Sequence, residues 1–207
     1  DPDPAGAVPA RSPPRWDEAR RLPAAVWWIV GLGAVFTLAR FSDAFLVLRA
    51  RSVGLDVMWA PLIMVVMNVV YAAAAYPVGV LADRCDRRLL LVVGLGLLAL
   101  ADAILALIAT PTGLWVGAAL WGLHMGFTQG LFATLVADAA PADRRGTAFG
   151  VFNLVSGVAL LVASLLAGAL WEAIGPQATF LAGVVFAGAT LVGTLRLVPA
   201  TATGRTG

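Results

Sequence analysis

The sequence has little charge and almost none of the residues that bind metals or carry redox chemistry. Its 207 residues include one cysteine, one histidine and no lysine, and only 13% are charged. A single cysteine forms no intramolecular disulfide, and no Cys/His spacing is typical of a metal site. We therefore expect no disulfide framework, no metal and no cofactor.

Basic residues are few and have no pattern typical of nucleic-acid binding. All 14 are arginine, and they nearly balance 12 acidic residues, for a net charge of +2. The chain has no basic run with interleaved aromatic residues. No nucleic-acid partner is expected.

Hydrophobic residues, in contrast, are abundant. They make up 60% of the chain, and the mean hydropathy is +0.89, whereas soluble proteins have about 45–50% apolar residues. At about 20 apolar residues per crossing helix, the chain is long enough for about six crossings. The composition predicts an all-α polytopic membrane protein with six transmembrane helices and contacts with membrane lipids.

Polar segments separate six hydrophobic spans. We place the spans at residues 24–48, 58–81, 89–110, 113–137, 147–171 and 178–198. Residues 1–23 contain six prolines and four arginines, which predicts a disordered cytoplasmic linker or tail. Residues 24–198 then form the membrane domain, and residues 199–207 a short cytoplasmic tail.

The arginines near the ends of the spans and between them predict the orientation. With the N-terminus in the cytoplasm, eleven of them lie on the cytoplasmic side and two, Arg49 and Arg51, outside. By the positive-inside rule, both termini are expected in the cytoplasm and the chain in the cell (inner) membrane. Inside the spans, small residues at four-residue spacing, such as Gly122, Gly126 and Gly130, predict close helix packing.

Charged residues within the spans are candidates for function, because a charge at membrane depth is costly. Arg40 and Asp43 lie three residues apart in the first span, so they share one helical face. Two interpretations stay open: an ion pair that makes insertion tolerable, or a substrate or proton site facing a central cavity. Asp102 in the third span is a weaker candidate for a proton carrier.

Polar residues in the other spans extend the candidate solute or proton pathway. His124, the only histidine, shares a face of the fourth span with Trp121 and Thr128, and Gln129 lies beside that face. An imidazole can exchange protons near neutral pH, although a structural hydrogen bond to a neighbouring helix is the commoner role of a lone histidine. Asn68 and Tyr71, three apart in the second span, are further candidates, and interhelical hydrogen bonding is the alternative.

The most specific motif lies between the second and third spans. It reads Gly79-Val80-Leu81-Ala82-Asp83-Arg84-Cys85-Asp86-Arg87-Arg88 and resembles the loop signature of the major facilitator superfamily. The departure is Asp86, where the family usually has glycine. Residues 137–150 resemble a second loop of that family, between its tenth and eleventh helices.

The resemblance implies a fold, a function and partners. It implies that the six spans are the C-terminal half of a twelve-helix bundle, with the N-terminal six-helix half as partner. It further implies secondary active transport of a small-molecule solute by alternating access, with proton coupling through Asp43 or His124. The loop residues Gly79, Asp83, Arg84, Arg87 and Arg88 would act as a conformational latch.

Two other functions are weighed against transport. A six-span protein that self-associates or does not transport is one alternative. An intramembrane enzyme is the other, but the chain lacks the HExxH and GxSxG arrangements of such catalysts. We therefore do not expect an enzyme.

Overall fold

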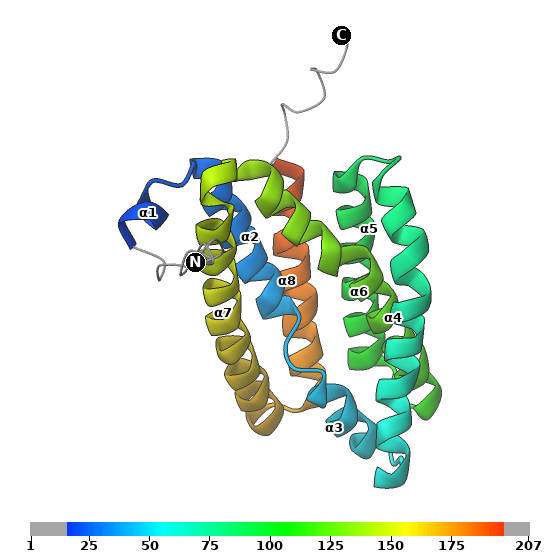
Figure 1. The fold of residues 1–207 in the computed structure, drawn as a ribbon. Coiled ribbons are helices and arrows are strands. Elements are labelled where there is room, and N and C mark those ends of the chain that lie inside the picture. The colour runs from blue at the N-terminus through cyan, green and yellow to red at the C-terminus, as the bar shows by residue number, and fades with distance from the viewer. Residues whose placement is uncertain (1–15, 197–207) are drawn as a thin grey trace, which may run out of the picture.

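The structure is a computed structural model that describes residues 16–196, and all its regular elements are helices (Figure 1). The elements are α1 (Trp16–Arg20), α2 (Ala24–Ala39), α3 (Ala44–Ser52), η1 (Val57–Trp59), α4 (Ala60–Ala82), α5 (Arg87–Leu107), α6 (Pro111–Ala139), η2 (Ala142–Arg144), α7 (Arg145–Ala173) and α8 (Pro176–Arg196). The all-α prediction is confirmed. Of the segment 1–23, expected to be disordered, residues 16–20 form α1, and residues 1–15 lie outside the description, as does the predicted tail at 199–207.

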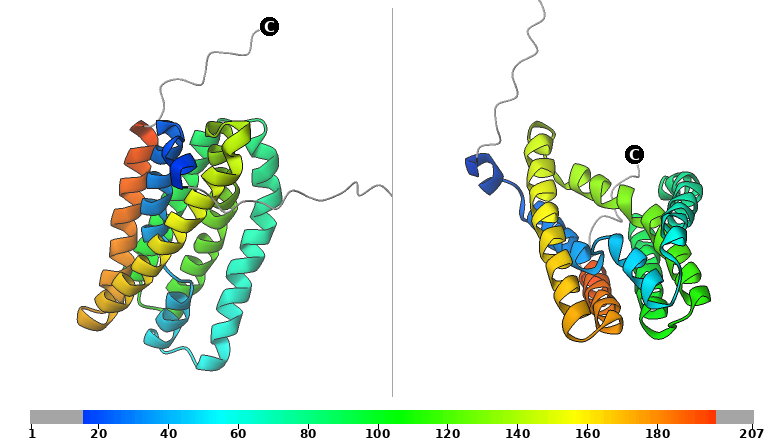
Figure 2. Two further views of the ribbon diagram at one scale, coloured as in Figure 1. Left: turned by 60° about the vertical axis from the view of Figure 1, so that its left-hand side comes forward. Right: turned by 90° about the horizontal axis from the view of Figure 1, so that it is seen from below.

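The long helices form two groups of three (Figure 2, right). Helices α2, α7 and α8 contact one another, and α6 packs against both α4 and α5. The two groups meet mainly where α5 packs along α8. The two groups of helices therefore form one bundle rather than two separate units.

The connections between helices alternate between the two ends of the bundle. Residues 83–86 and 140–144 lie at the same end as α1, and residues 53–56 and 174–175 lie at the other (Figure 1). Consecutive helices are therefore antiparallel, as the short polar separators predict. The short helix α1 lies at the edge of the bundle (Figure 2), where the Thr147 hydroxyl donates a hydrogen bond to Glu18.

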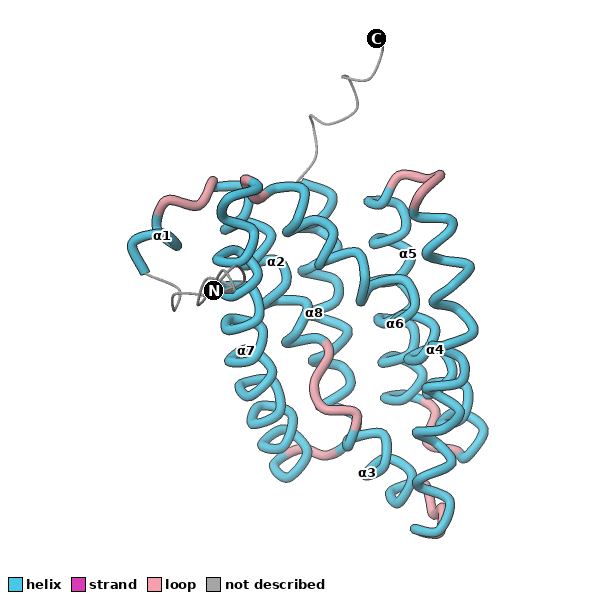
Figure 3. Tube along the Cα trace, in the orientation of Figure 1, coloured by secondary structure: helices cyan, strands magenta, loops and turns pink. Residues whose placement is uncertain are grey.

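The prediction that residues 24–48 form one uninterrupted helix is wrong. Helix α2 ends at Ala39 and α3 begins at Ala44, and residues 40–43 between them are not helical (Figure 3). The backbone of Arg40 has φ −103° and ψ 68°. The Ser42 hydroxyl accepts a hydrogen bond from the Ala44 N–H, a local bond that competes with helix formation. We call residues 40–43 the helix break.

Five helical segments in the described chain are long and apolar enough to cross a membrane. They are Ala24–Ser52, Ala60–Ala82, Arg87–Leu107, Ala142–Ala173 and Pro176–Arg196. The remaining expected span, residues 113–137, corresponds to α6, which has 29 residues and carries His124 and Gln129. The structure therefore supports a multi-pass bundle and places α6 against both α4 and α5.

Glycines on α6 allow α4 to approach closely. A Cβ atom at Gly122 would lie 2.1 Å from the Met67 carbonyl oxygen, and one at Gly126 would lie 2.7 Å from the Ala74 Cβ. Gly130 lies four residues further along α6, and a Cβ atom added there would have no neighbouring atom within 4 Å. The predicted close packing at small residues is confirmed at Gly122 and Gly126 and is absent at Gly130.

Candidate functional site

A cavity of about 800 Å³ opens beside the helix break. This central cavity is lined by residues of α2, the break, α3, α4 and α7. The lining residues are Phe36, Thr37, Arg40, Phe41, Ser42, Asp43, Ala44, Val47, Met64, Ser156, Gly157, Leu160 and Ser164. A space of this size with a mixed apolar and polar wall is typical of sites for small organic molecules.

Arg40 and Asp43 both lie in the wall of the central cavity. Because residues 40–43 are not helical, the two do not share a helical face as predicted. They interact electrostatically, but among residues 16–196 no nitrogen of Arg40 comes within 4.0 Å of a carboxylate oxygen. The direct ion pair of the first interpretation is therefore not formed, and both residues line the cavity.

Trp121 of α6 fixes the position of Asp43. Its indole Nε1–H donates a hydrogen bond to Asp43 Oδ1 at 3.2 Å, while the ring is fully buried. Trp121 and Phe180 also flank Phe41 of the break, with ring centroids 5.5 Å and 5.6 Å from it. This aromatic packing holds the break against α6 and α8.

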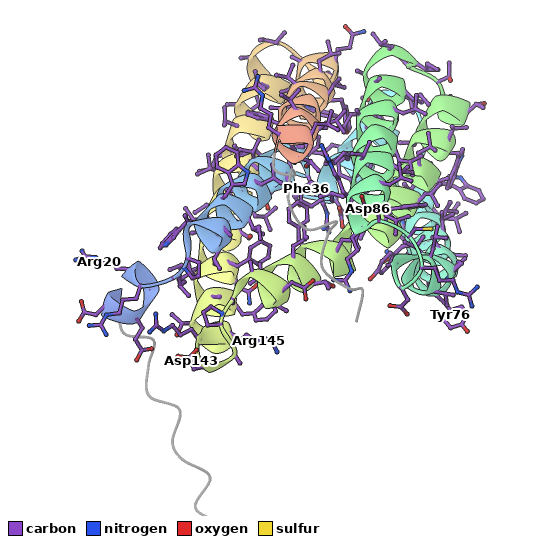
Figure 4. All side chains as sticks on the ribbon, turned by 90° about the horizontal axis from the view of Figure 1, so that it is seen from above. Arg20, Phe36, Tyr76, Asp86, Asp143 and Arg145 are labelled. Atoms are coloured by element: carbon purple, nitrogen blue, oxygen red, sulfur yellow. The ribbon has the colours of Figure 1, made fainter. Side chains whose placement is uncertain are left out.

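Phe36 forms another part of the cavity wall. It lies inside the bundle, whereas Tyr76 lies on the outer surface of α4 (Figure 4). The Phe36 ring stacks on Phe132 of α6, with centroids 4.9 Å apart. The aromatic side of the cavity is thus rigidly packed against the central helix.

A second cavity, of about 370 Å³, lies between α4 and α6. The Tyr71 hydroxyl donates a hydrogen bond to Gln129 Oε1 across it, at 3.0 Å. Gly79, Asp83 and Arg87 from the predicted latch loop line the same cavity. The structure therefore joins Tyr71 to Gln129 rather than to Asn68, whose amide donates to the Met64 carbonyl of its own helix.

His124 and Thr128 lie in the interior and line neither cavity. Both side chains are fully buried, and the Thr128 hydroxyl donates to the His124 carbonyl at 2.9 Å. The His124 ring meets the Trp121 ring edge to face, with centroids 5.7 Å apart. Neither imidazole nitrogen has a hydrogen-bond partner among the described residues. Of the three residues on the predicted face, only Trp121 reaches a cavity residue.

Asp102 is likewise buried within the bundle. Its carboxylate lies beside Gly183 of α8, where an added Cβ atom would be 2.3 Å from Oδ2. Both carboxylate oxygens lack hydrogen-bond partners in the described part of the chain. Asp102 lines neither of the two cavities and is not part of the candidate site.

The predicted latch loop joins three helices at one end of the bundle. Arg87 at the start of α5 forms an ion pair with Asp138 near the end of α6, and Arg88 donates a hydrogen bond to the Leu195 carbonyl at the end of α8. Asp86 caps α5, since its carboxylate accepts the Arg88 N–H at 2.8 Å. Its backbone is extended, with φ −61°, so this position needs no glycine here.

Asp83 and Arg84 have no partner of this kind. Neither side chain makes a hydrogen bond or ion pair with residues 16–196. Asp83 ends α4 and borders the second cavity.

Sequence reasoning named Ser156, with Asn153, as a further candidate but missed three other hydroxyl residues of the central cavity, Thr37, Ser42 and Ser164. Ser156, Leu160 and Ser164 follow one another at four-residue steps on α7, and all three line it. Thr37 and Ser42 add hydroxyl groups from α2 and the break. The four-residue repeat on α7 is visible in the sequence, but the same spacing also marks helix packing, so it does not by itself indicate a cavity.

Five long apolar helices, antiparallel connections and a mixed-polarity cavity at a helix break together define a multi-pass helical membrane protein. The family model described as Major Facilitator Superfamily matches residues 24–207. The chain belongs to this superfamily. It is 33% identical over 174 residues to the "Uncharacterized MFS-type transporter MJ1317" of Methanocaldococcus jannaschii. The match covers 81% of this chain but 44% of that relative, so the chain spans less than half of the relative's length.

Proposed function

We propose that the chain is the C-terminal half of a secondary active transporter that moves a small solute by alternating access. Its membership of the major facilitator superfamily supports transport, and the central cavity beside the helix break supports a solute site. The main support for a solute site is that Arg40 and Asp43 line this cavity without forming a direct ion pair, although charge at membrane depth is costly.

The second six-helix half would cover faces that this bundle leaves open. Helices α4 and α7 are the least buried of the five membrane-length segments, and α7 exposes large apolar side chains such as Leu161 and Leu165. The matched relative is more than twice as long as the matched segment. Residues 1–23 would then be the cytoplasmic linker between the halves, residues 24–198 the seventh to twelfth membrane helices, and residues 199–207 the tail.

Immunoblotting of native membranes tests this half-transporter assignment. An antibody against this chain should detect a polypeptide roughly twice the 21.4 kDa of these 207 residues. A band near 21.4 kDa would instead support a self-associating six-span protein.

Cys85 tests the proposed orientation, in which both termini and the latch loop lie in the cytoplasm. It is the only cysteine of the chain and is exposed in the described structure. A membrane-impermeant maleimide should label it in inside-out vesicles and leave it unlabelled in right-side-out vesicles. The reverse pattern would contradict this topology.

Proton coupling is proposed to run through Asp43. This carboxylate borders the cavity, whereas His124 is enclosed within the bundle and lines neither cavity. Flux of a panel of sugars, amines, organic acids and amino acids should be measured in vesicles with and without a pH gradient. Asp43→Asn should abolish the effect of the gradient, and the exposed control Asp17→Asn should retain it. A flux that ignores the gradient in the unmodified transporter would contradict coupling.

The latch is proposed to act through the ion pair of Arg87 with Asp138. This pair connects the loop after α4 to the end of α6, next to a cavity that Asp83 also borders. In the complete transporter, Asp83→Asn should lower the transport rate and leave membrane insertion intact. An unchanged rate would refute the latch role of Asp83.

A further inference from the structure

Two opposite charges border the central cavity and are not neutralised by a direct contact with each other. Arg40 and Asp43 lie at the two ends of the four-residue helix break, and both belong to the cavity wall. The ion pairs found in residues 16–196 involve neither of them. Since an unpaired charge away from water is costly, a bound ligand that pairs with both would stabilise this arrangement.

Arg40 offers its whole guanidinium group to a ligand. Its nitrogens make no hydrogen bond within the described residues, whereas its backbone N–H bonds to the Phe36 carbonyl. A guanidinium presents its donors as a planar fork that fits the oxygens of a carboxylate or a phosphate. The Arg40 side of the cavity is therefore suited to an oxyanion.

Asp43 offers one oxygen of a carboxylate that is already held in place. The Trp121 indole bonds to Oδ1, and Oδ2 has no hydrogen-bond donor in the structure from residue 16 to 196. A positioned carboxylate with a free oxygen is suited to an ammonium group. Asp43 alone would select cations, and Arg40 alone would select anions, so their proximity favours ligands with both charges.

The other residues of the cavity wall limit the size and polarity of a ligand that binds both Arg40 and Asp43. Ser42 and Ser164 provide hydroxyl groups, and Phe36 and Leu160 provide apolar surface. A cavity of about 800 Å³ holds a small organic body. We propose, resting on the transport function proposed above, that the solute is a small zwitterion whose oxyanion binds Arg40 and whose ammonium group binds Asp43.

Flux measurements on the complete transporter in vesicles test this inference. The zwitterionic probes are L-leucine, L-phenylalanine and phosphoethanolamine, which separate carboxylate from phosphate recognition. Each is paired with analogues that carry charge of one sign only: isoamylamine and isocaproate, phenethylamine and hydrocinnamate, ethanolamine and inorganic phosphate. At least one zwitterion should be transported at least about tenfold faster than either of its analogues, because each analogue leaves one charge of the site unpaired.

Variants that remove one charge test which residue binds the oxyanion of the solute and which binds its ammonium group. Arg40→Gln should lower flux of the transported zwitterion and make the amine analogue the preferred one of the set. Asp43→Asn should shift preference toward the anionic analogue, whereas Arg51→Gln, an exposed arginine of α3, should leave the order unchanged. Arg40→Lys keeps the positive charge but removes the planar donor geometry of the guanidinium group. In this variant the zwitterion should still have the highest flux of its set, at a reduced rate. A uniform loss of all three probes in the variants would show a structural role and overturn the inference.

The outcomes of the panel separate the two proposals. Transport of neutral or singly charged solutes, with no zwitterion transported, would overturn the zwitterion inference and leave the transport function standing. Absence of flux for every sugar, amine, acid and zwitterion tested would contradict the transport function itself.

Discussion

The indole of Trp121 on α6 donates a hydrogen bond to the carboxylate of Asp43 at the helix break, with 3.2 Å between Nε1 and Oδ1. The two residues are 78 positions apart in the chain. This bond ties the central helix of one three-helix group to the charged wall of the cavity. It makes Trp121 a positioning residue for the candidate site.

Trp121→Phe should lower solute flux while preserving most of the packing around Phe41. Phenylalanine keeps an aromatic ring but removes the donor to Asp43, and a lost hydrogen bond to a charged group is worth about 1.5–3 kcal/mol. Flux in vesicles, with protein level measured in parallel, checks the effect. Trp171→Phe is the matched control, because Trp171 packs on Phe45 and Phe180 without contacting Asp43. An equal loss of flux in both variants would contradict a specific role for Trp121.

Gly122→Ala should destabilise the bundle far more than Gly130→Ala. The added methyl group at Gly122 would lie 2.1 Å from a backbone oxygen of α4, so the two helices would have to separate. Overpacking of this kind costs about 1–3 kcal/mol, whereas the space at Gly130 is open. Thermal unfolding of the two purified variants in the same detergent compares them. Equal melting temperatures would show that α4 and α6 are not packed as described.

The Arg87 and Asp138 pair should matter more for transport than for stability. Both side chains are partly exposed, by 38% and 60%, and exposed ion pairs contribute about 0.2–1 kcal/mol. Arg87→Gln and Asp138→Asn should therefore shift unfolding little but slow transport. If the pair acts as one unit, the double variant should be no slower than the slower single variant. Additive effects on the transport rate would indicate separate roles.

The sequence predicted the helices well because hydrophobic length is a local property. The six apolar segments and the alternation of their connections follow from composition and polar separators alone. The helix break could not be predicted in this way. It contains no proline or glycine. A mean hydropathy taken over the whole span also hides Arg40, Ser42 and Asp43, because the residues around them are apolar. The aromatic contacts that hold Phe41 of the break in place come from Trp121 and Phe180, which belong to other helices.

The partners of the site residues were less accessible to sequence reasoning. Spacing along one helix correctly grouped Trp121 with His124, but it could not show that Trp121 reaches Asp43 while His124 stays enclosed. Tyr71 and Gln129 are 58 residues apart, so their bond depends on how α4 packs on α6. Gly122 and Gly130 look alike in sequence, and their different surroundings arise only in the packed bundle.

Water accessibility of the central cavity tests the account most directly, because it does not require the solute to be known. In the complete transporter with Cys85 and any other cysteine replaced by serine, Ser164→Cys on the cavity wall should react with a water-soluble maleimide. Leu165→Cys is the control on the same helix. Leu165 is 66% exposed on the bundle surface and should be shielded by lipid or by the other half. Rapid labelling of Ser164→Cys with little labelling of Leu165→Cys is the result we predict. Labelling of Ser164→Cys as slow as that of Leu165→Cys would contradict a solute pathway through this cavity.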